Sequence, residues 1–214
     1  MKSKKKLLRE SRLYIIVDKK ACSSRALLSL VKKIKSGRAK IIQLRDKQSD
    51  KATLIKEAYA LRKSLFNSKT VFIINDYIDI AKMLDCDGVH LGQDDLSLEI
   101  SRRILGEDKI IGISCHNLNQ ALQAQNRGAD YISIGPVFPT PLKPHIPKGI
   151  GLDLIKKIRK NIKIPFFAIG GINETNINKV ISSGAKRVAV CRAICQAKDA
   201  LPALKKLSKI LHRN

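Results

Sequence analysis

The sequence contains no tryptophan, and aromatic residues make up only 4% of its 214 residues. Proteins that bind single-stranded nucleic acid stack bases on aromatic side chains, so this composition disfavours that class. No stretch approaches about 18 uninterrupted apolar residues, and we therefore expect no membrane-spanning helix. The amino terminus is basic but lacks the apolar segment of a secretory signal.

The chain also lacks the cysteine spacings of common zinc sites. Its five cysteines form no Cys-x-x-Cys pair and have no histidine at zinc-ligand spacing. An odd, scattered set predicts reduced thiols and a cytoplasmic protein. We expect Cys191 and Cys195 to be packed core thiols rather than metal ligands.

Acidic residues are scarce, with 18 Asp and Glu against 42 Lys and Arg, which gives a formal net charge of +24. Such a charge fits nucleic acid, an acidic surface or an anionic small substrate, and it also fits a general excess of lysine. Apart from Lys4 to Lys6, the lysines are spread over helical faces. A nucleic acid is therefore the less favoured partner, and a homo-oligomer is compatible with the sequence.

Short apolar runs typical of strands alternate with amphipathic helical segments along the whole chain. The strand-like runs are Leu13–Val17, Lys40–Leu44, Val71–Ile74, Gly88–Leu91, Ile110–Ile113, Tyr131–Ile134, Pro165–Ile169 and Arg187–Val190. The helical segments are Ser24–Ile34, Asp50–Phe66, Ile78–Leu84, Ser97–Leu105, Leu118–Arg127, Leu152–Arg159, Asn176–Ser182 and Ala200–Leu211.

This alternation predicts a (β/α)8 TIM barrel in a single domain over residues 12–214. A loose basic tail over residues 1–11 would precede it. The alternative is an open doubly wound sheet, which usually has fewer strands and a glycine-rich first turn. The turn that follows Leu13–Val17 contains no glycine.

Polar residues follow the predicted strands at the end where such a barrel carries its active site. Gln43, Arg45 and Lys47 alternate along one run and share a face, where two cations call for an anionic ligand. Asp76 and Asp95 end the next two parallel strands, so both carboxylates should face one cleft and suit Mg2+. Each aspartate could instead cap the helix that follows it.

Glycines follow the seventh predicted strand, where barrels of this kind often bind phosphate. Gly170-Gly171 would let backbone N–H groups approach an oxyanion, although such a pair also occurs in simple turns. Together with the metal cleft, this predicts two phosphorylated groups in one site. His90 lies within a predicted strand, and we expect it to be structural rather than catalytic.

Several segments, in this order, resemble the thiamine-phosphate synthase family. The matching segments are QLRDK at residues 43–47, ND at 75–76, DGVHLGQDDL at 87–96, GISCH at 112–116, GADYISIGPVFPT at 128–140 and AIGGIN at 168–173. The resemblance extends over about residues 12–195, and together the motifs are highly specific.

The resemblance implies a TIM barrel that joins hydroxymethylpyrimidine diphosphate to hydroxyethylthiazole phosphate, with Mg2+ required. Asp76 and Asp95 would hold Mg2+, while Arg45, Lys47 and Lys143 would neutralise the leaving pyrophosphate. The residues implied for the pyrimidine diphosphate are Gln43, Arg45, Lys47, Asn75, Ser114 and Lys143. Those implied for the thiazole phosphate are Thr140, Gly171, Cys191 and Arg192.

The chain departs from the family pattern at two positions. Leu142 stands where the family usually has a second threonine, and Arg192 stands where it usually has a serine. Both positions concern the thiazole phosphate. A thiazole tautomerase-like or degenerate relative is the alternative, but it would be expected to lose the diphosphate-binding cations and the metal pair, which this chain keeps.

Overall fold

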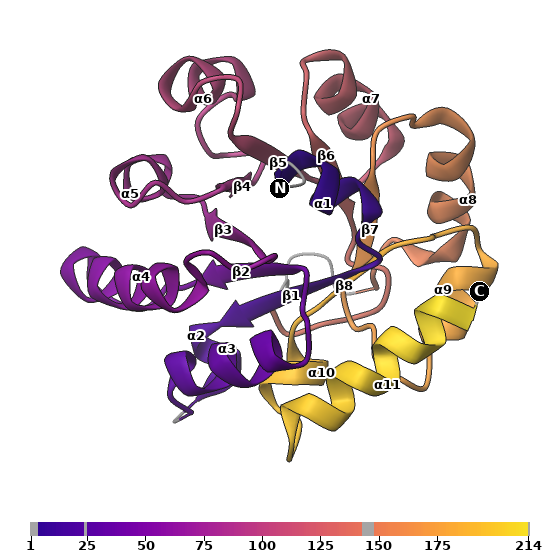
Figure 1. Ribbon diagram of the computed structural model, residues 1–214. Helices are drawn as coiled ribbons and strands as arrows, with labels where there is room; N and C mark the ends of the chain where they lie inside the picture. Colours follow the sequence, from indigo (N-terminus) through magenta and orange to yellow (C-terminus); the bar gives the residue numbers. More distant parts are fainter. Residues whose placement is uncertain (1–3, 24, 143–147, 214) are drawn as a thin grey trace.

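The computed structural model describes residues 4–23, 25–142 and 148–213, and its centre is a closed barrel of eight parallel strands in sequence order (Figure 1). The strands are β1 (Leu13–Asp18), β2 (Ile41–Arg45), β3 (Val71–Asn75), β4 (Gly88–Leu91), β5 (Ile110–Cys115), β6 (Tyr131–Ile134), β7 (Phe166–Ile169) and β8 (Val188–Val190). β8 pairs with β1 and closes the barrel. The predicted (β/α)8 fold is confirmed.

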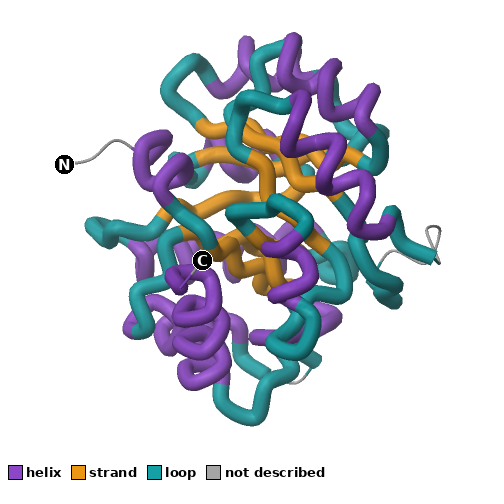
Figure 2. The backbone as a smooth tube through the Cα atoms, turned by 90° about the vertical axis from the view of Figure 1, so that its right-hand side faces the viewer, coloured by secondary structure: helices purple, strands orange, loops and turns teal. Residues whose placement is uncertain are grey.

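Helices follow the strands and surround the barrel, as Figures 1 and 2 show. The main helices are α3 (Leu27–Ser36), α4 (Lys51–Leu65), α5 (Ile78–Met83), α6 (Leu98–Leu105), α7 (Leu118–Asn126), α8 (Gly151–Asn161), α9 (Ile177–Ser182) and α11 (Ala200–Arg213). Two four-residue helices, α2 (Lys19–Cys22) and α10 (Arg192–Cys195), follow β1 and β8. They were not predicted, because four residues are too few to show a helical period.

The strands are buried on both faces, which explains their continuous apolar runs. Ile41 and Ile73 belong to the cluster inside the barrel, whereas Ile42 and Ile74 pack in the layer between strands and helices. Tyr131 lies inside the barrel and is fully buried. Side chains alternate between the two faces of each strand, so each strand contributes both to the cluster inside the barrel and to the layer under the helices.

The loose tail predicted at the amino terminus is wrong for residues 4–10. Lys4–Glu10 form the helix α1, and its Leu7 and Leu8 are buried in the cluster inside the barrel. Figure 1 shows α1 lying across the barrel. An isolated seven-residue helix would not be stable in water, so these contacts with the barrel must hold it in place.

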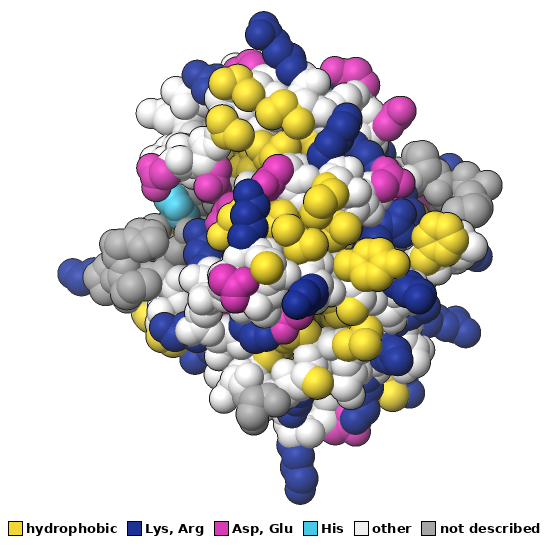
Figure 3. All heavy atoms as spheres, turned by 90° about the vertical axis from the view of Figure 1, so that its left-hand side faces the viewer, with side chains coloured by type: hydrophobic (Ala, Val, Ile, Leu, Met, Phe, Trp, Pro, Cys, Tyr) yellow, Lys and Arg dark blue, Asp and Glu magenta, His cyan; other side chains and the backbone are white. Residues whose placement is uncertain are grey.

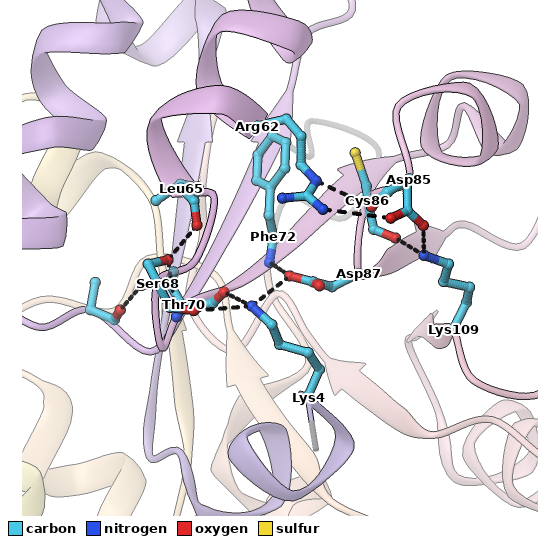
Figure 4. A network of polar contacts seen from close by, with 11 residues as sticks. Lys4, Arg62, Leu65, Ser68, Thr70, Phe72, Asp85, Cys86, Asp87 and Lys109 are labelled. Atoms are coloured by element: carbon cyan, nitrogen blue, oxygen red, sulfur yellow. Dashed lines mark hydrogen bonds and ion pairs between the residues drawn. The ribbon is translucent and has the colours of Figure 1, made fainter. Parts of the chain in front are cut away.

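Polar contacts also attach α1 to the strand starts (Figure 4). Lys4 Nζ donates to Thr70 O at 2.5 Å and lies 3.2 Å from Asp87 Oδ2. The same Asp87 oxygen accepts from Phe72 N at 2.8 Å. Helix α1 is therefore tied to the chain just before β3 and β4.

The outer face over α4 to α6 exposes several large apolar side chains. Figure 3 shows apolar side chains on this face, interspersed with lysine and arginine. The exposed residues are Tyr59, Phe66, Met83, Leu96, Ile100 and Ile104. Across the described residues, no helix combines the length and apolarity needed to cross a membrane.

Candidate active site

A cavity of about 330 Å3 opens among the carboxyl ends of the strands. Its walls come from the ends of β1 and β2 and from the segments that follow β5 to β8. Six residues predicted for the site line it: Arg45, Ser114, Thr140, Gly171, Cys191 and Arg192. The parallel barrel thus brings Arg45 and Arg192 to one cavity, although they lie 147 positions apart in the sequence.

Arg45 is paired with a residue that the sequence analysis missed. Its Nη1 donates to Asp18 Oδ2, and the register of β1 and β2 sets these two residues side by side. The Asp18 side chain is only 2% exposed and also accepts from Ala21 N at 2.8 Å. The charge of Arg45 therefore does not by itself call for an anionic ligand, because the buried carboxylate of Asp18 already compensates it.

Gln43 and Asn75 lie side by side on β2 and β3. Gln43 Nε2 donates to Asn75 Oδ1 at 3.2 Å, and both side chains are buried. Each amide therefore holds the other in one orientation. This predicted pair lies outside the lining of the 330 Å3 cavity.

Lys47 and the predicted metal pair meet at the ends of β2, β3 and β4. Lys47 Nζ lies 2.8 Å from Asp76 Oδ2. Burial raises the pKa of Asp76; hydrogen bonding to Asp95 and the charge of Asp95 raise it further, and Lys47 opposes the shift. The two carboxylates therefore lie close to each other, at the ends of the adjacent parallel strands β3 and β4.

Neither aspartate caps a helix, so the capping alternative is wrong. The residue at the N-cap of α5 is Tyr77, and Ser97 caps α6. Asp95 Oδ2 accepts from Gly92 N at 2.6 Å. Asp76 has a positive φ of 65°, a region that aspartate enters more readily than most residues but that still costs energy. Such strain is typical of functional positions.

The carboxylate pair fits Mg2+ better than a metal with many protein ligands. Within the described residues, no group of three or more His, Cys, Asp and Glu side chains is placed to hold a metal. Mg2+ commonly takes one or two carboxylates and completes its shell with water and substrate phosphate oxygens. Asp76 and Asp95 could supply two carboxylates of such a shell.

Ser114 is held by a hydrogen-bonded chain that runs through the barrel. His90 Nε2 lies 2.9 Å from Ser114 Oγ and 3.2 Å from Ser133 Oγ. His90 Nδ1 lies 2.9 Å from the Tyr131 hydroxyl, which lies 2.8 Å from that of Tyr14. Burial raises the pKa of both tyrosines, so their hydroxyls stay protonated. His90 is buried within this chain, which fits the structural role expected for it, and it contacts Ser114, which lines the cavity.

The loop after β7 needs both of its glycines. Gly170 and Gly171 have φ values of 102° and 64°. A Cβ on Gly170 would lie 2.3 Å from Pro136 Cα, and one on Gly171 would lie 2.8 Å from Phe138 Cβ. The loop therefore packs closely against the segment after β6 while lining the cavity.

The two positions that depart from the family pattern lie at the same cavity. Leu142, after β6, and Arg192, after β8, both line it, and both side chains are half-buried. Arg192 therefore lines the same cavity as Gly171. Lys143, predicted to be catalytic and to bind substrate, lies outside the described residues.

The cysteines are all free, as expected. Cys195 is buried, and its Sγ lies 3.4 Å from Ile16 O. Cys191 is half-buried and lines the cavity. The prediction of packed thiols is confirmed for Cys195, while Cys191 also borders the site.

Comparison with known proteins shows the family of this chain. A family model described as thiamine monophosphate synthase matches residues 13–194. The chain belongs to the thiamine monophosphate synthase family. A thiamine-phosphate synthase of Shouchella clausii is 42% identical over 188 residues, which cover 88% of this chain and 90% of that protein. One from Syntrophomonas wolfei is 39% identical over 202 residues, covering 94% and 97%.

Solved structures agree with this membership. A thiamine phosphate pyrophosphorylase from Pyrococcus furiosus superposes with a TM-score of 0.86 at 33% identity, covering 97% of this chain and 98% of that one. A 3-hexulose-6-phosphate synthase superposes with a TM-score of 0.63 at 17% identity, which is a likeness of fold alone. The family resemblance read from the motifs is confirmed.

Proposed function

We propose that this chain joins hydroxymethylpyrimidine diphosphate to hydroxyethylthiazole phosphate, forming thiamine phosphate and releasing pyrophosphate. Family membership supports this activity. The observation that carries the proposal is the meeting of Asp76, Asp95 and Lys47 at one side of the barrel mouth. A cavity lined by Arg45 and Arg192 lies among the same strand ends. One face therefore offers two places for phosphorylated groups.

The reaction needs charge stabilisation more than acid or base chemistry. The bond that breaks joins the pyrimidine methylene carbon to the diphosphate, and its electron pair leaves with pyrophosphate. The bond that forms joins the thiazole nitrogen to the same carbon, and this nitrogen becomes the cationic nitrogen of the product. No proton must be removed, so neither a protein base nor a nucleophile is required.

Three groups of residues would contribute to different parts of this reaction. Arg45, Lys47 and Lys143 would bind the diphosphate and stabilise its growing charge as it leaves. Asp76 and Asp95 would hold Mg2+, which supplies further positive charge to the leaving group. Gln43, Asn75 and Ser114 would orient the pyrimidine diphosphate, so that the methylene carbon faces the second substrate.

The thiazole phosphate would bind in the 330 Å3 cavity. Thr140, Gly171, Cys191 and Arg192 line that cavity and would surround the phosphate. The guanidinium of Arg192 presents a planar fork of donors that suits phosphate oxygens. The second substrate would thus lie beside the diphosphate of the first, as a direct attack requires.

Other properties of the protein follow as part of this proposal. Five free cysteines support a reducing compartment, and we place the protein in the cytoplasm. The partners are the two small phosphorylated substrates rather than a nucleic acid. The exposed apolar side chains over α4 to α6 are compatible with a homo-oligomer, and sedimentation would establish the oligomeric state.

The test is to incubate the protein with both substrates and Mg2+ and to detect products by mass. We expect thiamine phosphate and pyrophosphate in equal amounts, and neither when the thiazole phosphate or Mg2+ is omitted. Conversion of a thiazole tautomer without any condensation would favour the tautomerase alternative. A DNA complex that weakens steeply with salt, unaffected by either substrate, would favour nucleic-acid binding.

A further inference from the structure

A second cavity lies at the end of the barrel opposite the candidate active site. It has a volume of about 550 Å3 and is bordered by the starts of β6, β7 and β8 and by the end of α1. Because the strands are parallel, these starts and the carboxyl ends face opposite ways. No residue in the described part of the chain lines both cavities. This second cavity is therefore separate from the proposed reaction.

Cations dominate the lining of this cavity. They are Arg9, Arg159, Lys163, Lys186 and Arg187. The only acidic residue among the described lining is Asp130. Its carboxylate is already engaged, with Lys5 Nζ at 2.8 Å and Arg102 Nη2 at 2.7 Å. The cavity cations are thus not neutralised by the acid that lies nearest to them.

Arg187 shows the charge imbalance most clearly. Its Nη2 donates to Arg9 O at 2.7 Å. Its Nε is buried and has no hydrogen-bond partner among the described residues. Burial, and then the charges of Arg12 and Arg159, lower the pKa of Arg187. A buried donor and repelling neighbours both disfavour this arrangement unless an acceptor with negative charge is present.

The backbone offsets only part of this charge. Helix α8 ends at Asn161, between Arg159 and Lys163, and a helix carboxyl terminus carries about half a negative charge. The stem of Arg159 passes Gly184, where an added Cβ would lie 3.2 Å from Arg159 Cγ. The glycine leaves room for the arginine at this position. Several positive charges remain.

The size and lining of the cavity indicate the class of ligand. One phosphate group can contact only one or two of five cations spread around a space of about 550 Å3. A chain of two or three phosphates can reach more of them, and guanidinium groups bind such oxygens in pairs. The cavity also has apolar walls at Ile162, Ile164 and Phe166, which could lie against an attached organic group.

We propose that the cavity between α1 and the starts of β6 to β8 binds a small di- or triphosphate anion. Inorganic pyrophosphate and a nucleoside diphosphate share this chemistry, and the apolar walls would add affinity only for the nucleotide. The site does not depend on the proposed function, since its residues are distinct from those at the carboxyl ends of the strands.

The test is calorimetry of the full chain with sodium pyrophosphate and, separately, with ADP, in the presence of EDTA. We expect the candidate active site to bind pyrophosphate as well, so wild type should show two binding events. Arg159→Gln with Lys163→Gln should weaken the second event by at least about tenfold, because two charge-assisted contacts are lost. Tighter binding of ADP than of pyrophosphate at this event would assign the nucleotide as the source.

The matched control is Lys205→Gln with Lys209→Gln, which removes the same charge from exposed positions of α11. Calorimetry of this control with pyrophosphate and with ADP should give the same binding events as wild type. Without ligand, Arg159→Gln with Lys163→Gln should melt at the same temperature as wild type or higher, since like charges have been removed.

Four results would overturn the proposal. One is an unchanged titration in Arg159→Gln with Lys163→Gln. Another is an equal loss of affinity in the α11 control. The third is a lower melting temperature of the ligand-free cavity variant with no change in anion binding, which would show that these cations only stabilise the fold. Binding of an RNA oligonucleotide but of neither small anion would equally contradict it.

Discussion

Lys47 Nζ lies 2.8 Å from Asp76 Oδ2 and joins the ends of β2 and β3 beside Asp95. The same lysine is 54% exposed, so it can exchange the carboxylate for a ligand at little cost. Asp76 is more buried and sits close to a second negative charge. A bound cation would replace the lysine as the partner of the two carboxylates, leaving Lys47 for the diphosphate.

We therefore predict that Asp76→Asn reduces turnover by at least about a hundredfold, since it removes charge from the proposed Mg2+ site. Asparagine also tolerates a positive φ, so the fold should survive. Turnover measured against Mg2+ concentration, together with urea denaturation, checks both points. Asp94→Asn is the control, because Asp94 is exposed and one residue from Asp95. Wild-type turnover and Mg2+ dependence in Asp76→Asn would rule out this site.

Arg45 and Lys47 should respond differently to loss of charge. Arg45→Gln leaves Asp18 buried without its cation, and we expect a loss of about 1–3 kcal/mol in unfolding free energy. Lys47→Gln breaks a pair whose lysine is 54% exposed, and it should cost about 0–1 kcal/mol. Both variants should bind the pyrimidine diphosphate about ten- to a hundredfold more weakly.

Denaturation and calorimetry on the two variants separate stability from binding. The thiazole phosphate serves as the control ligand, since its affinity should change much less in both proteins. Equal stability of the two variants would contradict the role given to the Asp18–Arg45 pair. Unaltered diphosphate affinity in both would contradict the binding assignment.

The hydrogen bonds that link Tyr14, through Tyr131 and His90, to Ser114 predict how kcat depends on the two tyrosine hydroxyls. A hydroxyl closer to Ser114 in this series should matter more. Tyr131→Phe removes the partner of His90 Nδ1, so the imidazole and Ser114 should lose their fixed orientation. We expect a stability loss of about 1 kcal/mol and a lower kcat. Tyr14→Phe removes a hydroxyl that is one link further from Ser114 and should change kcat less. Steady-state kinetics with the pyrimidine diphosphate as varied substrate checks the order, and an equal effect of both would show that the chain is only structural.

Leu142 and Arg192 line one cavity, and we predict that the arginine compensates for the missing hydroxyl. Arg192→Ser alone should raise KM for the thiazole phosphate. Leu142→Thr together with Arg192→Ser should recover part of that loss, because both positions would contact one phosphate and their effects should not add. KM measured for the single and double variants decides, with KM for the pyrimidine diphosphate as the control. An unaltered KM in Arg192→Ser would mean that this side chain does not touch the phosphate.

Much of the fold could be read from local patterns. Gly88–Leu91 and Tyr131–Ile134 have the same bounds in the structure as in the sequence analysis, because each is a short apolar run between polar turns. The meeting of Asp76 and Asp95 was also predictable, since parallel strands bring their carboxyl ends to one side. Short helices such as α10 were missed because they bury too few residues to leave a periodic signal.

The sequence by itself determined the barrel and the set of polar residues at its mouth, because periodicity and strand direction depend on residues close together in the chain. Tertiary structure alone decided which of those residues are partners. The Asp18–Arg45 pair depends on the register between β1 and β2. Leu7 and Leu8 are buried only because the eight strands close into a barrel whose interior cluster they join. The cations around Arg187 come from α1, α8 and the starts of distant strands. Such contacts arise only when the barrel closes, since no local pattern encodes the distance between segments far apart in the chain.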